Sequence, residues 1–411
     1  MVYQTQSNAY VAYKKQSGLG VQQSGAGASI LRAAGGQGGR LTKGVTASNE
    51  ARRDAMRTRG RHGIQKTAGS YSGEWSLGSL DDILASMMRG GYGVSDLVLD
   101  EGDFTSITTG ENTIVLASGD PRDLGLRVFD VFRLNDHASG GNNARNLRIT
   151  GLDATTITVA ETLTVNAVAD TACTITRPGR VLINPPAGSL VRDYYTIEEC
   201  ELDIDGSEVF TDCFWGGATF RMGPNGILMF EPQWVGTGKF DVKTGATSPF
   251  FTSPAETTTE PMAVVDATIR VGSEDVVDLT AFDITMTTAP TAPETFGSGQ
   301  IKTSPDVFPG SMAVNVNFTA LRSDLSRVAS LRDEEVLSLH VLAVDNEPNP
   351  QSFLSIAIGN FTLGGVDKSA ISKEGGPKTQ TISVPAELVG KDERGAGYDP
   401  TMVKFQISNA A

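Results

Sequence analysis

Short runs in which apolar and polar residues alternate recur through most of the chain, and this pattern constrains the fold more than any other feature. The runs are rich in Thr, Val and Ile, and Gly, Asn or Asp separates one run from the next. Because successive side chains of a strand point to opposite faces, such runs predict strands with one buried face. Helical periodicity is confined to two stretches, 80–89 and 321–335. We therefore expect a mainly β fold.

Three of these runs predict particular features. Residues 194–205 alternate without a break, which places four carboxylates on one face of a strand: Glu199, Glu201, Asp203 and Asp205. The sequence Gly223-Pro224-Asn225-Gly226 separates two further runs and predicts a hairpin turn. A second hairpin is expected through 151–154.

Two short helices are expected beside the strands. In the first, Ser79 is the predicted N-cap and Gly90 and Gly91 end the helix. Its apolar stripe, which serves either the core or an interface, consists of Leu80, Ile83, Leu84 and Met87. In the second helix the apolar residues nearly in line are Leu321, Leu325, Val328 and Leu331.

The first 66 residues differ from the rest in composition and charge. Gly, Ser, Gln and Ala dominate, so little core can form there. The segment has eleven Lys and Arg against two acidic residues, a net charge of +9, whereas the whole chain has −14. Five of its arginines are clustered: Arg52, Arg53, Arg57, Arg59 and Arg61. The segment is either a disordered basic tail or an arm that orders on an adjacent, acidic copy of the chain, which favours self-assembly.

The strand pattern divides the chain into four parts. Residues 1–66 form the extended N-terminal arm, and 67–97 begin the main domain with a strand and the first helix. Residues 98–180 consist of short Thr-rich and Val-rich runs and have the length of a small inserted β domain. Longer strands return in 181–411, the second part of the main domain.

The motifs of enzymes and metal sites are missing from the sequence. There is no P-loop, HExxH or GxSxG sequence, and the three histidines, His62, His137 and His340, are far apart. The three cysteines form no CxxC pair and are expected to be buried. Asp203-Ile204-Asp205-Gly206 begins like a calcium loop, but the later ligands are absent. We therefore expect no catalysis, no metal and no cofactor.

Membrane association and export are not expected either. No run of about 18 apolar residues occurs. The first residues lack the apolar run that follows the charges of a signal peptide, so the chain is expected to fold in the cytosol where it is made.

Four pieces of the sequence, in this order, resemble the tail tube proteins of long-tailed bacteriophages. The pieces are an Arg-rich segment ending in GSYSGEWSL, a strand leading into LDDILASMM, the run LRITGLDATTITV, and DYYTIEECELDIDGSEVFTDC with a later strand–helix–strand ending. The resemblance implies a β-barrel-like sandwich with short flanking helices. It also implies six copies in a ring, rings stacked into a hollow tube of the virion tail, and assembly in the host cytoplasm. Tape-measure, tail tip and terminator proteins would be its partners, and DNA would pass through without specific binding.

In such a tube each part of the chain has an expected place. The arginines of the arm would dock on an acidic face of a subunit in the next ring, since guanidinium groups suit carboxylates. The face that carries Glu199, Glu201, Asp203 and Asp205 is a candidate for the lumen, because negative charge repels DNA phosphates; the alternative is an ordinary solvated strand face. The inserted domain would lie outside, because a bore has no room for it.

Two other functions remain open at the level of sequence. One is the tube protein of a contractile tail or secretion machine, which a neighbouring sheath gene would favour. The other is a carbohydrate-binding or receptor-binding module that uses exposed aromatic side chains. Its candidate residues are Trp75, Trp215 and Trp234. An aromatic content of 7% does not favour a sugar-binding platform, and these tryptophans are better suited to the core.

Overall fold

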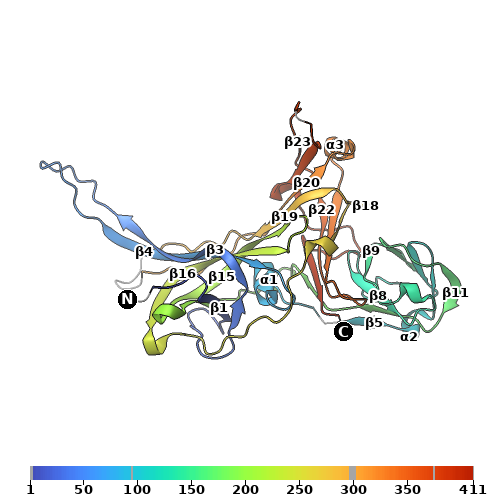
Figure 1. Cartoon of the computed structure of the whole chain (residues 1–411), viewed down its shortest axis with the longest axis horizontal. Coiled ribbons are helices and arrows are strands. Elements are labelled where there is room, and N and C mark those ends of the chain that lie inside the picture. The colour runs from blue at the N-terminus through green and yellow to red at the C-terminus, as the bar shows by residue number, and fades with distance from the viewer. Residues whose placement is uncertain (1–2, 94–95, 296–301, 374, 411) are drawn as a thin grey trace.

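A computed structural model describes residues 3–93, 96–295, 302–373 and 375–410, and it confirms the mainly β class. Two sheets enclose the main core, and a third sheet belongs to the unit at one end of the molecule (Figure 1). A long hairpin extends away from the body at the other end (Figure 1).

The largest sheet has eleven strands in the described part of the chain, and β15 is its centre. The strand β16 pairs with β15 along almost all of its length, and β4 and β3 follow beyond β16. The other edge of β15 pairs first with β14 and then with β19, so the sheet divides into two branches. The strands are β1 (Ala9–Lys15), β2 (Ser29–Leu31), β3 (Ala33–Thr46), β4 (Arg61–Glu74), β14 (Tyr195–Glu201), β15 (Gly206–Met222), β16 (Met229–Thr244), β19 (Leu279–Thr287), β20 (Ala313–Leu321), β23 (Gly365–Lys368) and β24 (Thr379–Val384).

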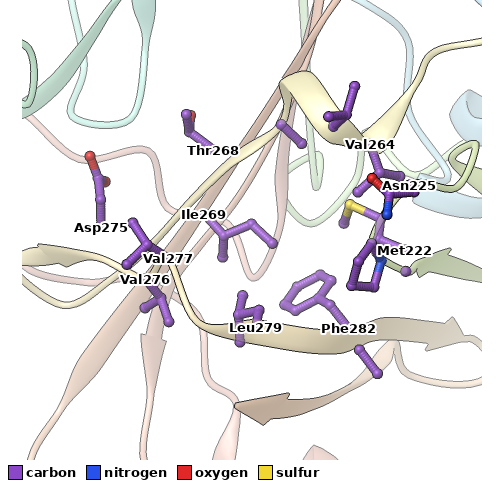
Figure 2. A pocket seen from close by; sticks show the side chains of 15 residues that line it. Met222, Asn225, Val264, Thr268, Ile269, Asp275, Val276, Val277, Leu279 and Phe282 are labelled. Atoms are coloured by element: carbon purple, nitrogen blue, oxygen red, sulfur yellow. The ribbon is translucent and has the colours of Figure 1, made fainter. Parts of the chain in front are cut away.

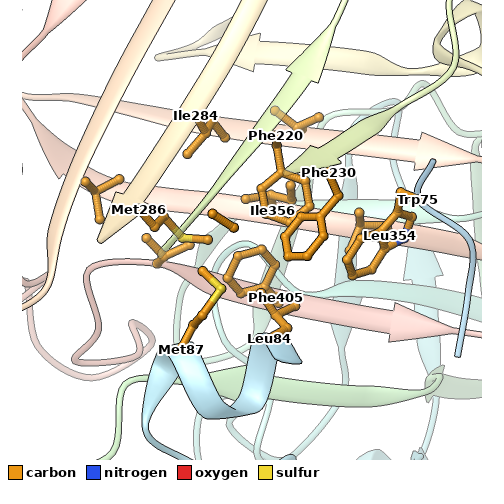
Figure 3. Packing of buried hydrophobic residues seen from close by; sticks show 14 of the residues in the cluster. Trp75, Leu84, Met87, Phe220, Phe230, Ile284, Met286, Leu354, Ile356 and Phe405 are labelled. Carbon is orange, nitrogen blue, oxygen red and sulfur yellow. The ribbon is translucent and has the colours of Figure 1, made fainter. Parts of the chain in front are cut away.

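A six-stranded sheet packs against this large sheet and completes a sandwich. Phe220 of β15 and Phe230 of β16 meet Phe405 of the smaller sheet in the core, while Leu84 and Met87 of the first helix close it from the side (Figure 3). The strands of the smaller sheet are β13 (Arg180–Ile183), β17 (Thr268–Val271), β18 (Glu274–Asp275), β21 (Leu337–Val344), β22 (Phe353–Phe361) and β25 (Lys404–Ser408).

The first predicted helix is present as α1 (Asp81–Met88), and its apolar stripe is part of the core. All four predicted stripe residues are at most 2% exposed: Leu80, Ile83, Leu84 and Met87. The predicted N-cap is wrong, because Leu80 occupies that position and the Ser79 hydroxyl donates to the Ser76 carbonyl instead. The helix ends at Arg89, which adopts a left-handed conformation with φ 55° before the two glycines.

The second predicted helix is shorter than its pattern. The helix α3 (Ser326–Arg332) buries none of its residues, and Leu321 is the last residue of β20, paired with Thr379 of β24. Leu321 is therefore in a strand, because its pairing within the sheet outweighs the helical spacing of the apolar residues.

Residues 97–177 contain an eight-stranded sheet whose strands pair only with one another in the described part of the chain. Phe104 of α2 (Glu101–Phe104) and Phe132 lie in a separate core cluster of this inserted unit. The hairpin expected through 151–154 is present, with Ile157 opposite Leu152. The strands are β5 (Leu97–Leu99), β6 (Ile107–Thr109), β7 (Thr113–Leu116), β8 (Val131–Asn135), β9 (Leu147–Leu152), β10 (Thr156–Val159), β11 (Asn166–Asp170) and β12 (Thr174–Arg177).

A polar junction attaches the inserted unit to the six-stranded sheet. The Lys404 ammonium lies 2.6 Å from the Asp130 carboxylate of the inserted unit and 2.5 Å from Asp399. The Gln406 side chain accepts a hydrogen bond from the Val131 amide and donates to the Val131 carbonyl. Since Asp130 and Gln406 are fully buried, this junction fixes the unit against the sheet.

The first 66 residues are more ordered than their composition indicates. The strand β1 lies within the large sheet, between β14 and β2. The strands β3 and β4 form the long hairpin, from Ala33 opposite Gly73 to Thr46 opposite Arg61.

Close packing explains why two positions of this hairpin are glycine. A Cβ atom on Gly39 would lie 2.6 Å from the Phe210 ring, and one on Gly69 would lie 2.6 Å from the Trp234 indole nitrogen. Glycine at these positions lets the hairpin lie directly on aromatic side chains.

Candidate functional site

The predicted arginine cluster lies at the far end of the projecting hairpin. Residues 47–60 connect β3 to β4, and Arg61 begins β4. All five arginines are exposed: Arg52, Arg53, Arg57, Arg59 and Arg61. Arg52 pairs with Asp54 at 2.9 Å, whereas the other four make no ion pair with any part of the chain that the structure describes. The tip of the hairpin therefore presents four arginines that are free to pair with acceptors outside the described chain.

The predicted acidic face is not one continuous row. The strand β14 ends at Glu201, and 202–204 form a turn of 3₁₀ helix. Glu199 is turned into the fold, where it accepts hydrogen bonds from the Tyr71 hydroxyl at 2.7 Å and from the Gly39 amide. Burial raises the pKa of the Glu199 carboxyl.

The other three carboxylates lie at the end of β14 and beyond it. Asp203 accepts hydrogen bonds from the Thr5 hydroxyl, the Thr5 amide and the Asn8 side chain, and these bonds lower its pKa. Glu201 and Asp205 are exposed. Of the four residues, Glu199 is thus bonded to the hairpin, and Asp203 is bonded to the N-terminal segment.

One acidic neighbour was missed by sequence reasoning. Glu208 of β15 lies directly opposite Glu199, and its pKa is raised by burial and by the charges of Glu199 and Glu201. Like charges on directly opposed residues destabilise a sheet. Only the pairing of β14 with β15 brings these carboxylates together, and the order of residues along one strand carries no sign of it.

Replacing Glu199 with Gln tests this arrangement through its dependence on pH. Because the folded pKa is raised, stability contributed by Glu199 is complete below its unfolded value of about 4.3 and is lost as pH rises through the folded value. Glu199→Gln keeps an acceptor for Tyr71 but removes the charge. We expect its melting temperature to exceed that of the wild type by a few degrees at pH 8 and to equal it near pH 4. Equal melting temperatures at both pH values would contradict the buried charge, and Glu256→Gln, at an exposed position away from this strand, is the control.

The large sheet has free edges that suit pairing with other copies. Within the described residues β3 pairs only with β4, and β23 pairs only with β24, at the other limit of the sheet. The fourteen residues of β3 make this edge long. Unpaired N–H and C=O groups along such edges are ready to accept a strand from another chain.

An apolar hollow of about 360 Å³ opens at the end of the sandwich (Figure 2). Ile269 faces Leu279 and Phe282 across it, and Val277 at its rim is 95% exposed (Figure 2). Among the described residues that line it, Asp275 is already paired with Arg148 and Arg270. The hollow therefore offers contact area and has no set of converging polar groups for chemistry.

The described residues show no other sign of a reactive centre. They contain no group of three or more His, Cys, Asp or Glu side chains placed to hold a metal, and Cys173, Cys200 and Cys213 are buried with free thiols. Trp75, Trp215 and Trp234 are also buried, so they cannot form a platform for sugars. In the part of the chain described, no helix has the length and apolar character needed to cross a bilayer.

Comparison with known proteins identifies the family. No curated protein matches this chain. The family model described as phage tail tube protein matches residues 6–388, which include the hairpin, the inserted unit and nearly all of the sandwich. The mainly β sandwich, the free sheet edges and the projecting basic hairpin agree with a component that assembles with copies of itself. The chain therefore belongs to the phage tail tube protein family, whose members are structural proteins of the virion tail.

Proposed function

We propose that six copies of this chain close into a ring and that the rings stack into the hollow tail tube. The tube encloses the tape-measure protein during assembly in the host cytoplasm and later conducts DNA to the next host. Tail tip and terminator proteins limit it at its two ends. The observation that carries this proposal is the exposed basic tip of the β3–β4 hairpin, held away from an acidic body.

Lateral contacts within a ring are assigned to the edges of the large sheet. Pairing between neighbours satisfies the backbone groups that β3 and β23 leave free. When a head-to-tail contact closes on itself, no edge remains and lateral growth stops. A ring of fixed size follows, and the next ring must be held by other surfaces.

Stacking is assigned to the hairpin. Its unpaired arginines need carboxylates, and four of the five lack them within the described chain. An acidic surface in the adjacent ring supplies them, so each hairpin connects one ring to the next.

Reversing two charges at the hairpin tip tests the stacking contact. We expect Arg57→Glu with Arg59→Glu to shorten tubes at least tenfold in negative-stain electron micrographs, because each contact is repeated around every ring. Arg122→Glu with Arg145→Glu, in the inserted unit, makes the same change in net charge away from both proposed contacts and should leave tube length unchanged. Tubes of normal length and thermal stability from the hairpin variant would exclude this contact.

The ring itself is tested by microscopy and mass measurement on the wild type at increasing concentration. Six-fold rings or hollow tubes are expected. A protein that stays monomeric at every concentration, also when tail tip protein is added, would overturn the proposed function.

A further inference from the structure

The two outer faces of the sandwich differ in what covers them. The inserted unit lies on the outer face of the six-stranded sheet, where Leu342 and Phe353 pack against Val131. The Lys404 and Gln406 contacts described above extend this cover over β25. In the part of the chain that the structure describes, the outer face of the large sheet, over β15, β19, β20 and β24, has no such cover, and Thr285, Asn317 and Thr319 are partly exposed there.

This uncovered face is made of short polar side chains. Neighbouring strands place hydroxyl and amide groups opposite one another in register: Thr219, Thr285 and Asn315 form one row, Asn317 lies in the next, and Thr319 is opposite Thr381. These six residues are called the hydroxyl face below. Hydroxyl pairs join Thr219 to Thr285 and Thr319 to Thr381, each at 3.1 Å. The face is therefore polar, and four of its six side chains are paired with one another.

Charge on this surface is low and, on balance, negative. Arg221 lies in the same row as Asn317, and its guanidinium is 3.1 Å from the Glu231 carboxylate. Asp283 is directly opposite Arg221 and accepts a hydrogen bond from Asn317 at 3.1 Å. Glu231 thus neutralises Arg221, and Asp283 together with Asp367, which lies opposite Thr381, leaves carboxylates in excess.

Such a surface suits a polyanion that must pass without binding. Proteins hold duplex DNA chiefly by placing Lys and Arg against phosphates and releasing counterions. Single strands are held by exposed aromatic rings. The hydroxyl face offers neither, whereas its hydroxyl and amide groups keep the surface hydrated.

We propose that the hydroxyl face lines the bore of the tube and is the surface past which duplex DNA slides. This assignment rests on the proposed tube and names the part of the chain that faces its contents. The inserted unit then lies on the outside, because it covers the opposite face of the sandwich. Glu199, Glu201, Asp203 and Asp205 lie on or beyond the β14 branch of the sheet, apart from this face.

A single introduced cysteine tests the assignment in assembled tubes. The three native cysteines are buried, so an added thiol is the reactive one. Thr319→Cys places it on the hydroxyl face, and Thr285→Cys is the second variant if the first does not assemble. Val168→Cys in β11 of the inserted unit, a position 74% exposed, is the matched control. Tubes of each variant are treated with a small biotin maleimide and then with streptavidin.

Both variants should react with the small reagent, which diffuses into the bore, but streptavidin should decorate only the walls of Val168→Cys tubes. Streptavidin along the walls of Thr319→Cys tubes would place the face outside and overturn the inference. A thiol that reacts in free subunits but is protected in tubes would place the face between subunits, with the same consequence. Either result would contradict only this inference and would leave the proposed tube function intact. Absence of tubes from the wild type would instead reject the proposed function itself.

Discussion

Phe220→Ala is expected to lower the free energy of unfolding of the tube body by about 3–5 kcal/mol. The Phe220 ring is fully buried, and its centroid lies 4.8 Å from that of Phe230, 5.4 Å from Trp75 and 5.8 Å from Phe405. Since Phe405 belongs to the six-stranded sheet, the substitution opens a cavity between the two sheets (Figure 3). The loss is measured as a lower denaturant midpoint with an unchanged slope.

Tryptophan fluorescence measures the unfolding of the Phe220→Ala variant in the sandwich alone, without a signal from the inserted unit. All three tryptophans lie in the main core or the large sheet, and the inserted unit has none, so tryptophan fluorescence follows the body alone. Phe220→Leu keeps most of the volume and should lose less than half as much stability. A loss below about 1 kcal/mol for Phe220→Ala would show that the two sheets do not depend on this contact.

Lys404→Met is expected to destabilise the protein by about 3–5 kcal/mol, because it leaves a buried carboxylate without its cation. The Lys404 side chain is 4% exposed and the Asp130 side chain 0%. Arg177, 3.5 Å from Asp130, compensates only in part. The inserted unit should also loosen from the sheet, which is measured as faster proteolysis at its two connections to the body.

The control for this variant removes both charges. Asp130→Asn combined with Lys404→Met leaves no fully buried ion, since Asp399 keeps Arg127 at 4.0 Å and Arg177 is partly exposed. The double variant should therefore recover at least half of the lost stability. If the double variant were less stable than Lys404→Met by the full effect of a second substitution, the two side chains would not be coupled and the junction would have to be explained otherwise.

Periodicity along the chain predicted much of this fold. Alternating runs gave the strands, and the 3.6-residue spacing of Leu80, Ile83, Leu84 and Met87 gave a helix whose stripe is core. These signals are local, since each depends on which face of one element is buried. Local signals failed at Ser79, whose hydroxyl bonds to the Ser76 carbonyl three residues earlier, and at Leu321, where pairing with the distant Thr379 decides the conformation.

The functional surfaces were less accessible to sequence reasoning. The arginine cluster was visible in the sequence as a run of charge. Its place at the tip of a hairpin was not, because a glycine-rich composition is typical of disordered segments. Gly39 is an example, because glycine is required there by close contact with Phe210, which is far away in sequence. The hydroxyl face is a pattern across strands, and it becomes visible only when the register of β15, β19, β20 and β24 is known.

The strands that lead into and out of the inserted unit are neighbours. Leu97 of β5 is paired with Arg177 of β12, and the Asp96 amide donates to the Gly179 carbonyl at 3.0 Å. The chain therefore enters and leaves the unit at one place, where its two ends are about 5 Å apart as in any antiparallel pair. A foreign domain with equally close termini can be connected there, provided that it also covers Leu342 and Phe353 and supplies a partner for Lys404. The position is therefore suited to the exchange of whole domains, because the connections between the strands of the sandwich stay the same.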